Sequence, residues 1–147
     1  MLAITVKQFS ELNITELYEL LRLRSEVFVV EQNCVYQDVD DKDKTALHVL
    51  GKKEGKIVAY TRIFRPGDYF KEASIGRVVV AATERKFGFG KEIMIASIKA
   101  VENQLSYTTI KISAQCYLQK FYKSLGFESV GEEYLEDGIP HIGMIKN

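Results

Sequence analysis

The sequence has 147 residues, 46% of them hydrophobic and 27% charged, which are ordinary proportions and a usual length for one globular domain spanning residues 1–147. Lys and Arg together equal Asp and Glu at 20 each. This balance argues against a general binder of nucleic acid or of a membrane surface, which needs a basic excess. The two cysteines form no metal or redox pattern, and neither a signal peptide nor a bilayer-spanning run is evident. We therefore expect a cytoplasmic protein with reduced thiols and no metal.

The first elements are a strand and a long helix. Residues 2–6 alternate between apolar and small or polar side chains, which predicts a strand. Asn13 can cap a helix, and Glu16 three residues later supports a capping box. Apolar residues then recur at helical spacing, so we expect a helix from residue 14 to about residue 29 or 30.

Arg24 lies on the apolar face of this helix, and the segment after the helix, residues 33–45, is rich in acidic residues. Such an arginine either pairs with a structural acid or meets a carboxylate of a bound acceptor. Counted from Asp38, Lys42 and Asp43 stand where a calcium loop needs an oxygen ligand and a glycine. We therefore expect a solvated loop without a metal.

The middle of the chain predicts strands joined by short turns. Residues 46–51 and 57–64 are strand-like, and the short glycine-containing link between them indicates a hairpin. The next strand, residues 73–82, contains three successive valines, typical of a strand covered on both faces. Gly76 within this strand indicates a bulge or the close approach of another group.

The last third returns to helices and ends in a hairpin. A helix begins near Gly90, a strand covers residues 109–114, and a short amphipathic helix covers residues 117–126. Two strands around the turn Glu136–Pro140 close the chain. This order predicts an α/β (α+β) fold whose mixed, mostly antiparallel twisted sheet has about six or seven strands and helices on both faces.

The segment between the valine-rich strand and the helix can hold a phosphate. Glycines at alternate positions let the backbone turn without a Cβ blocking an anion, and the first helical amides attract negative charge. The segment lacks the Gly-Lys-Ser/Thr ending of a P-loop and the third glycine of the dinucleotide fingerprint. The candidate residues of this phosphate loop are Arg85, Lys86, Phe87, Gly88, Phe89, Gly90 and Lys91.

This loop resembles the Arg/Gln-x-x-Gly-x-Gly/Ala signature with which the GNAT superfamily of N-acetyltransferases wraps the pyrophosphate of coenzyme A. The order of elements over essentially all 147 residues, and the segment FYKSLGF near the C-terminus, are also similar to that superfamily. The segments LRLRSEVFVVEQNCVYQDVDDKD and EDGIPHIGM resemble its ElaA-like branch. The resemblance implies the GNAT fold and acetyl-CoA as cosubstrate.

The resemblance also implies roles for individual residues. Backbone groups at Val78, Val79 and Val80 would bind the pantetheine and polarise the thioester carbonyl. Tyr122, at the tyrosine of FYKSLGF, would protonate the leaving thiolate, although its position would serve core packing equally well. Gln115 stands where many members of the superfamily have asparagine, and its amide could still contact pantetheine.

The acceptor side is less defined. A general base could be Glu31, Asp38, Asp40 or His48, whereas His141 is expected to belong to the final hairpin rather than to the chemistry. The residues expected to contact the acceptor are Arg24, Glu31 and Asp38.

The leading hypothesis is an acetyl-CoA-dependent N-acetyltransferase that moves the acetyl group directly to a primary amine of a small molecule or peptide, in a ternary complex. The enzyme would be a monomer or a homodimer. Two alternatives stay open. One is an acyltransferase similar to acyl-homoserine-lactone synthases, whose opening helix carries an Arg-x-x-Val-Phe pattern matched from Arg24. The other is a non-catalytic regulatory module that binds coenzyme A.

Overall fold

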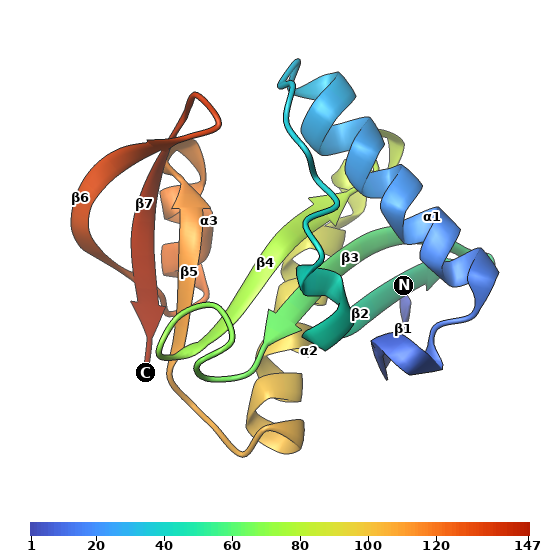
Figure 1. Ribbon diagram of the computed structural model, residues 1–147, viewed down its shortest axis with the longest axis horizontal. Coiled ribbons are helices and arrows are strands. Elements are labelled where there is room, and N and C mark those ends of the chain that lie inside the picture. Colours follow the sequence, from blue (N-terminus) through green and yellow to red (C-terminus); the bar gives the residue numbers. More distant parts are fainter.

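The computed structural model describes residues 1–147, and one twisted sheet in the order β1-β2-β3-β4-β5-β7-β6 forms its centre (Figure 1). Neighbouring strands are antiparallel except β4 and β5, which are parallel. This mixed sheet confirms the predicted fold class. The strands are β1 (Ala3–Gln8), β2 (Leu47–Lys53), β3 (Lys56–Phe64), β4 (Ala73–Val80), β5 (Ile110–Gln115), β6 (Glu128–Glu136) and β7 (Ile139–Lys146).

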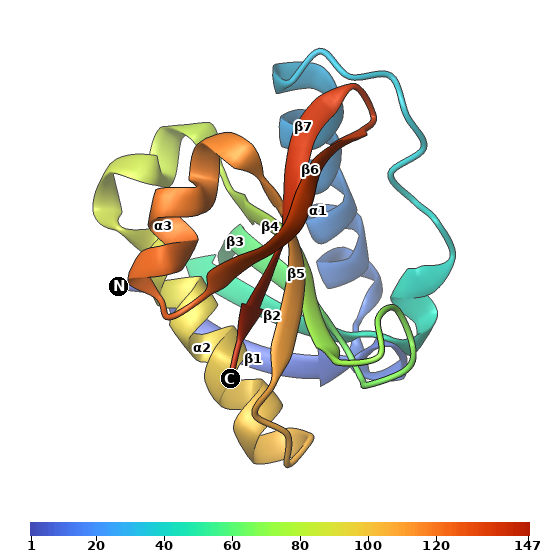
Figure 2. The same ribbon diagram turned by 90° about the vertical axis from the view of Figure 1, so that its left-hand side faces the viewer.

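Helices cover both faces of the sheet. Figure 2 shows α2 (Phe89–Gln104) and α3 (Gln119–Ser124) on one face and α1 (Ile14–Arg24) on the other. Successive side chains of β3 pack against opposite faces of the sheet, because neighbouring side chains of a strand point to opposite sides. Ala59 belongs to the apolar cluster that includes α2, and Tyr60 belongs to the cluster beneath α1. Each fully buried apolar side chain contributes about 1.5–3 kcal/mol to this packing.

The first helix begins as predicted. The Asn13 side chain accepts a hydrogen bond from the Glu16 amide at 2.8 Å, and the Glu16 carboxylate accepts one from the Asn13 amide at 3.0 Å. Beyond Arg24 the helix widens into a π-helical stretch, Ser25–Glu31, so it ends one residue later than expected. Such π-helical segments are frequent at functional sites, and this one ends beside the divergence of β4 and β5.

The parallel pair β4 and β5 is joined over a short length only. Its register consists of Ala73 opposite Ile110 and Ser74 opposite Lys111, after which the strands separate. Figure 1 shows the result, with β5, β7 and β6 diverging from β4. Backbone groups in the later part of β4 therefore face an opening rather than a partner on that side.

A β-bulge lies within β4, as predicted, but its strained residue is not the glycine. Tyr60 pairs with Val79 and Arg62 with Gly76, so β4 has one residue more than β3 between these pairs. Arg77 takes the left-handed conformation, with φ of 49°. A non-glycine residue in this conformation costs about 1–3 kcal/mol, so the surrounding structure must hold it in place. The salt bridges of Arg77 to Asp38 and Asp40 do this.

Candidate active site

A cavity of about 570 Å³ opens where β4 and β5 diverge. Its floor comes from β4 and β5, and the remaining walls come from the π-helical end of the first helix, the acid-rich loop (residues 33–45), α3 and the β6–β7 hairpin. The predicted site residues that line the cavity are Glu31, Val78, Val79, Val80, Arg85, Gly90, Gln115 and Tyr122.

The edge of β4 and the end of β5 offer unused polar groups to this cavity. Val79 is buried, whereas Val78 and Val80 are half-buried at the opening. At the end of β5 the Gln115 side-chain oxygen is buried without a hydrogen-bond partner, and its nitrogen lies 3.5 Å from the Gln32 oxygen. A buried unpaired acceptor costs about 1–3 kcal/mol. Gln115 therefore suits a ligand that brings an N–H donor, as a pantetheine amide does.

The phosphate loop lies at one end of the cavity. Residues 82–87 form a 3-10 turn, and Gly88, with φ of 75°, leads into α2. The first helical hydrogen bond in α2 runs from the Glu92 amide to the Gly88 carbonyl, which leaves the amides of residues 89–91 without helical partners. A Cβ at Gly88 would meet no atom within 4 Å. The segment is therefore an open cradle of the kind that binds a pyrophosphate.

The side chains of this loop have different surroundings. Lys86, Phe87 and Lys91 are exposed beside the cavity and do not line it. The Phe89 side chain is 2% exposed and belongs to the core. Phe89 can therefore contact the cofactor only through its backbone amide, and its expected cofactor contact stays a prediction.

Arg85 connects the phosphate loop to the end of the first helix. Its guanidinium donates two hydrogen bonds to the Glu31 carboxylate, at 2.5 and 2.8 Å, and a third to the Val80 carbonyl at 3.2 Å. The hydrogen bond from Arg85 lowers the pKa of Glu31, and the same contact raises the pKa of Arg85. Glu31 is thus occupied by a cation of the phosphate loop, which does not fit the expected contact with an acceptor.

Tyr122 lies on α3 at the wall of the cavity. Its residue is 6% exposed and its ring packs edge-on against Phe121 and Phe127. Burial raises the pKa of the Tyr122 hydroxyl, and nearby Tyr117 adds to this effect. The hydroxyl therefore carries its proton at neutral pH, as a proton donor must. The sequence left open whether Tyr122 packs in the core or lies at the site. Its position allows both, since it belongs to the core cluster and also lines the cavity.

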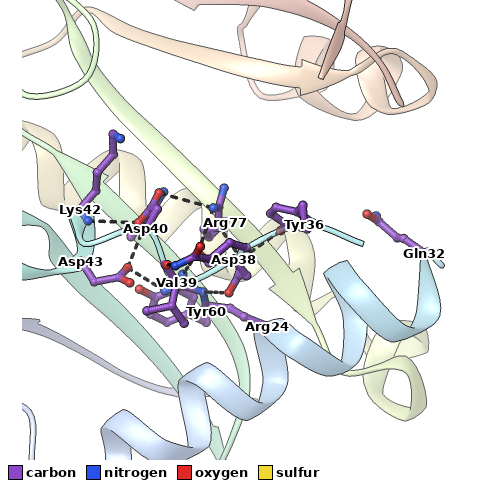
Figure 3. Close-up of polar contacts among 12 residues, drawn as sticks. Arg24, Gln32, Tyr36, Asp38, Val39, Asp40, Lys42, Asp43, Tyr60 and Arg77 are labelled. Atoms are coloured by element: carbon purple, nitrogen blue, oxygen red, sulfur yellow. Dashed lines mark hydrogen bonds and ion pairs between the residues drawn. The ribbon is translucent and has the colours of Figure 1, made fainter. Parts of the chain in front are cut away.

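The acid-rich loop is not a solvated loop, and this prediction is wrong. Three arginines from α1, β3 and β4 bind three of its aspartates in a continuous network of ion pairs (Figure 3). The network consists of Arg24, Arg62, Arg77, Asp38, Asp40 and Asp43. It holds the loop against the sheet and anchors the bulge of β4.

Arg24 lies at the centre of this network. It is fully buried, and it donates hydrogen bonds to the carboxylates of Asp38 at 2.8 Å and Asp43 at 2.7 Å and to the Asp38 carbonyl at 3.0 Å. Asp38 also pairs with Arg77 at 2.7 Å. The expected acceptor contacts of Arg24 and Asp38 are therefore corrected. Both residues are structural, because their charges are satisfied within the protein.

The remaining candidates for a general base are also occupied. Asp40 pairs with Arg62 at 2.7 Å, and hydrogen bonding to Arg62 outweighs the effect of burial and keeps the Asp40 pKa below its usual range. His48 is fully buried between the Tyr60 hydroxyl at 2.6 Å and the Asp43 carbonyl at 2.9 Å, and burial lowers its pKa. Neither group lines the cavity.

The structure instead brings His141 to the cavity, a residue that the sequence placed only in the final hairpin. His141 of β7 lies opposite Gln115 of β5 and opposite Tyr134 of β6 in the sheet register. Its Nε2 lies 3.5 Å from a carboxylate oxygen of Glu136, and both residues line the cavity. No local sequence signal marks this cluster, because its members come from three strands.

The site combines an open cradle for a phosphate, a separated pair of parallel strands and an adjoining polar pocket. This combination is typical of an acyltransferase that uses coenzyme A. The sequence model of the "Acetyltransferase (GNAT) domain" matches residues 7–147. Protein ElaA of Escherichia coli is 45% identical over 139 residues, which cover 93% of this chain and 91% of ElaA. The chain belongs to the GNAT acetyltransferase family, in its ElaA-like branch.

Solved structures agree with this assignment. The crystal structure of Escherichia coli ElaA superposes with a TM-score of 0.93 at 42% identity, covering all of both chains. An acyl-CoA N-acyltransferase from Pseudomonas aeruginosa gives a TM-score of 0.92 at 41% identity and 99% coverage of both chains. The acyl-homoserine lactone synthase BjaI gives a TM-score of 0.78 at 15% identity, covering 99% of this chain and 82% of that one. This last likeness shows a shared fold alone.

Proposed function

We propose that the protein is an acetyl-CoA-dependent N-acetyltransferase that moves the acetyl group directly to a primary amine of a small molecule or peptide. The observation that carries the proposal is the opening between β4 and β5, which leads from the free amides of α2 to the polar pocket under the β6–β7 hairpin. In this proposal acetyl-CoA and the amine lie along this opening at the same time. Direct transfer in a ternary complex follows, because catalysis then comes largely from positioning.

The residues present suit coenzyme A. The amides of residues 89–91 and the charges of Arg85, Lys86 and Lys91 would hold the pyrophosphate, and the edge of β4 with the Gln115 oxygen would hold the pantetheine. When bound, acetyl-CoA supplies an activated acetyl group as a thioester. The protein contributes hydrogen bonding to the thioester carbonyl from the β4 backbone, where negative charge develops during attack. Tyr122 supplies the proton that the departing sulfur requires.

The phosphate loop is tested by Gly88→Glu, because Gly88 opens onto the cradle. A glutamate there places a carboxylate beside the pyrophosphate and is expected to abolish saturable acetyl-CoA binding in calorimetry. The variant also forces a side chain onto a residue with positive φ, so Gly67→Glu is the matched control. Gly67 has φ of 91° and open space around its Cβ, in the turn before β4. Normal binding by folded Gly88→Glu would overturn the loop assignment.

The reaction is tested by release of free thiol from acetyl-CoA in the presence of a panel of amines and peptides, with mass spectrometry of the products. Acetylated amine together with free coenzyme A supports the proposal. Acetyl-CoA binding without turnover over the whole panel would instead indicate a non-catalytic binding module. Transfer of an acyl chain to S-adenosylmethionine would identify an acyl-homoserine-lactone synthase.

A further inference from the structure

A cluster of polar side chains covers the cavity side of β5, β7 and β6. His141 is its centre, with Gln115 opposite on one neighbouring strand and Tyr134 opposite on the other. Directly opposed residues of a sheet share a face, so these three side chains lie together. Glu136, two residues beyond Tyr134, lies on the same face and lines the cavity. His141 is 6% exposed, so its orientation is set by its neighbours rather than by water.

The hydrogen bonds of His141 determine which ring nitrogen is available. Its Nδ1 lies 2.7 Å from the Ile139 carbonyl oxygen. A carbonyl only accepts, so Nδ1 carries the proton and the neutral ring has its lone pair on Nε2. The Tyr134 ring stacks on the imidazole at a centroid distance of 6.1 Å and an angle of 25°. These two contacts hold the ring with its basic nitrogen toward Glu136.

Nε2 of His141 and the Glu136 carboxylate are close but not hydrogen-bonded to each other. The Glu136 oxygen nearest to Nε2 is 3.5 Å away, and the other oxygen accepts from the Ser113 hydroxyl at 3.3 Å. A lone pair and a carboxylate do not bond to each other, so a group with several N–H donors that lies beside them in the cavity could donate to both. Glu136 keeps 41% of its side chain exposed, so it can meet a ligand that enters the cavity.

We propose that the acceptor is a primary amine that is cationic at neutral pH, that Glu136 receives its ammonium group, and that Nε2 of His141 deprotonates it. This inference rests on the proposed N-acetyltransferase function and names its acceptor class and its base. The alternative bases are excluded by their contacts, since His48 is buried away from the cavity and three acids, Glu31, Asp38 and Asp40, are held by arginines.

The proton transfers balance. His141 takes one proton from the ammonium, and the resulting imidazolium is stabilised by the Glu136 carboxylate. The amine lone pair then forms the C–N bond as the C–S bond breaks, and Tyr122 gives its proton to the sulfur. The nitrogen, now positively charged, loses its second proton, which restores the Tyr122 hydroxyl. One proton remains on His141 and returns to water.

Several groups surround His141. β6 contributes the Tyr134 hydroxyl and the Glu136 carboxylate, and β5 contributes the neutral Gln115 side chain. The turn between β6 and β7 contributes Asp137, whose carbonyl accepts a hydrogen bond from the Cys34 thiol of the acid-rich loop. Glu136 is the group that compensates an imidazolium directly, since it is the acid that lies against Nε2.

The test uses His141→Asn, because the asparagine amide can still donate to the Ile139 carbonyl but offers no basic nitrogen. With an amine as basic as a lysine side chain, pKa about 10.4, kcat is expected to fall about 100-fold or more. With methoxyamine, which is uncharged at neutral pH, kcat is expected to stay within about threefold of wild type because no base is needed. The Kd for acetyl-CoA should not change, and the acid limb of the kcat/KM profile should disappear.

Glu136→Gln is expected to raise KM for the cationic amine about tenfold or more and to leave KM for methoxyamine unchanged, since the glutamine amide carries no charge to pair with the ammonium group. Glu128→Gln is the control, because Glu128 is exposed on the same strand and does not line the cavity. NMR of the ring nitrogens should show the neutral His141 protonated at Nδ1.

The outcomes separate the two proposals. A proton on Nε2 instead of Nδ1, or equal loss of activity with both amines in His141→Asn, overturns the base assignment and leaves the acetyltransferase function standing. Acetyl-CoA binding with no acetylation of any amine overturns the proposed function, and the base assignment falls with it.

Discussion

Replacing Arg24 with methionine tests whether buried ion pairs hold the acid-rich loop on the sheet. Arg24 is fully buried and makes two hydrogen bonds to carboxylates and one to a carbonyl, all between 2.7 and 3.0 Å. Methionine fills a similar volume but donates no hydrogen bond. Asp38 and Asp43 would then each lose a cationic partner while staying buried.

The expected loss follows from the contacts that remain. Breaking a buried ion pair by removing one partner costs about 3–5 kcal/mol, because the other charge stays desolvated. Asp43 keeps Arg62 at 2.9 Å, and Asp38 keeps Arg77 at 2.7 Å. We therefore expect the lower end of the range, about 3 kcal/mol in the free energy of unfolding. At about 2–4 °C per kcal/mol for a chain of this size, Tm would fall by about 6–12 °C.

The measurement is urea unfolding, followed by fluorescence and circular dichroism. Arg22→Met is the matched control on the same helix. Arg22 pairs with Glu26 at 2.9 Å but has a side chain that is 70% exposed. Exposed pairs of this spacing contribute about 0.3–0.5 kcal/mol. Arg24→Met should therefore lower the free energy of unfolding by about six times as much as Arg22→Met does, or more.

If Arg24→Met lowers the free energy of unfolding no more than Arg22→Met does, the reasoning is refuted. It would mean that the Arg24 charge contributes no more than a surface charge. A raised KM for a carboxylate-bearing acceptor, with stability unchanged, would return Arg24 to the acceptor contact considered from sequence.

Two further predictions concern proton binding. Burial alone would raise the pKa of Glu16, but hydrogen bonds from Lys7, the Asn13 amide and Lys52 outweigh it and lower the pKa from 4.5 to about 2. Glu16 therefore stabilises the fold above pH 4.5 and loses this effect as the pH falls toward 2. Urea unfolding of Glu16→Gln should show lower stability at neutral pH and a weaker pH dependence between pH 5 and 2, and parallel curves would contradict this. Tyr122→Phe should lower kcat about 100-fold or more without changing the Kd for acetyl-CoA, and unchanged turnover would leave Tyr122 a packing residue only.

The parts of the fold that were predicted correctly rest on local patterns. The Asn13 capping box, the hairpin between β2 and β3 and the turn at Asp137 and Gly138 each depend on residues a few positions apart. The turn before α2 is equally local, because Gly88 and Gly90 shape one turn before one helix, and its contact with a phosphate stays a prediction. Such features can be predicted from sequence, since they depend on hydrogen bonds between residues close in the chain and on the conformations that each residue type allows.

The incorrect predictions concern contacts between distant residues. The acid-rich loop has the composition of a solvated segment, but its Asp38 and Asp43 are buried against arginines, two of which come from strands 19 to 39 residues further on. The bulge that Gly76 indicated does lie in β4, but only the tertiary structure shows that its positive φ falls on Arg77, which salt bridges to Asp38 and Asp40 hold in place.

The sequence by itself determined the order of strands and helices and the Gly-x-Gly turn before α2, because periodicity and glycine spacing report local geometry directly. Tertiary structure alone decided which side chains meet around His141 at the cavity. Gln115, Tyr134 and His141 come from three strands whose register places them side by side, and no spacing along the chain expresses that register. Burial then decided the role of each charge. It paired Arg24 with acids of its own chain and left the Nε2 of His141 beside Glu136 at the cavity.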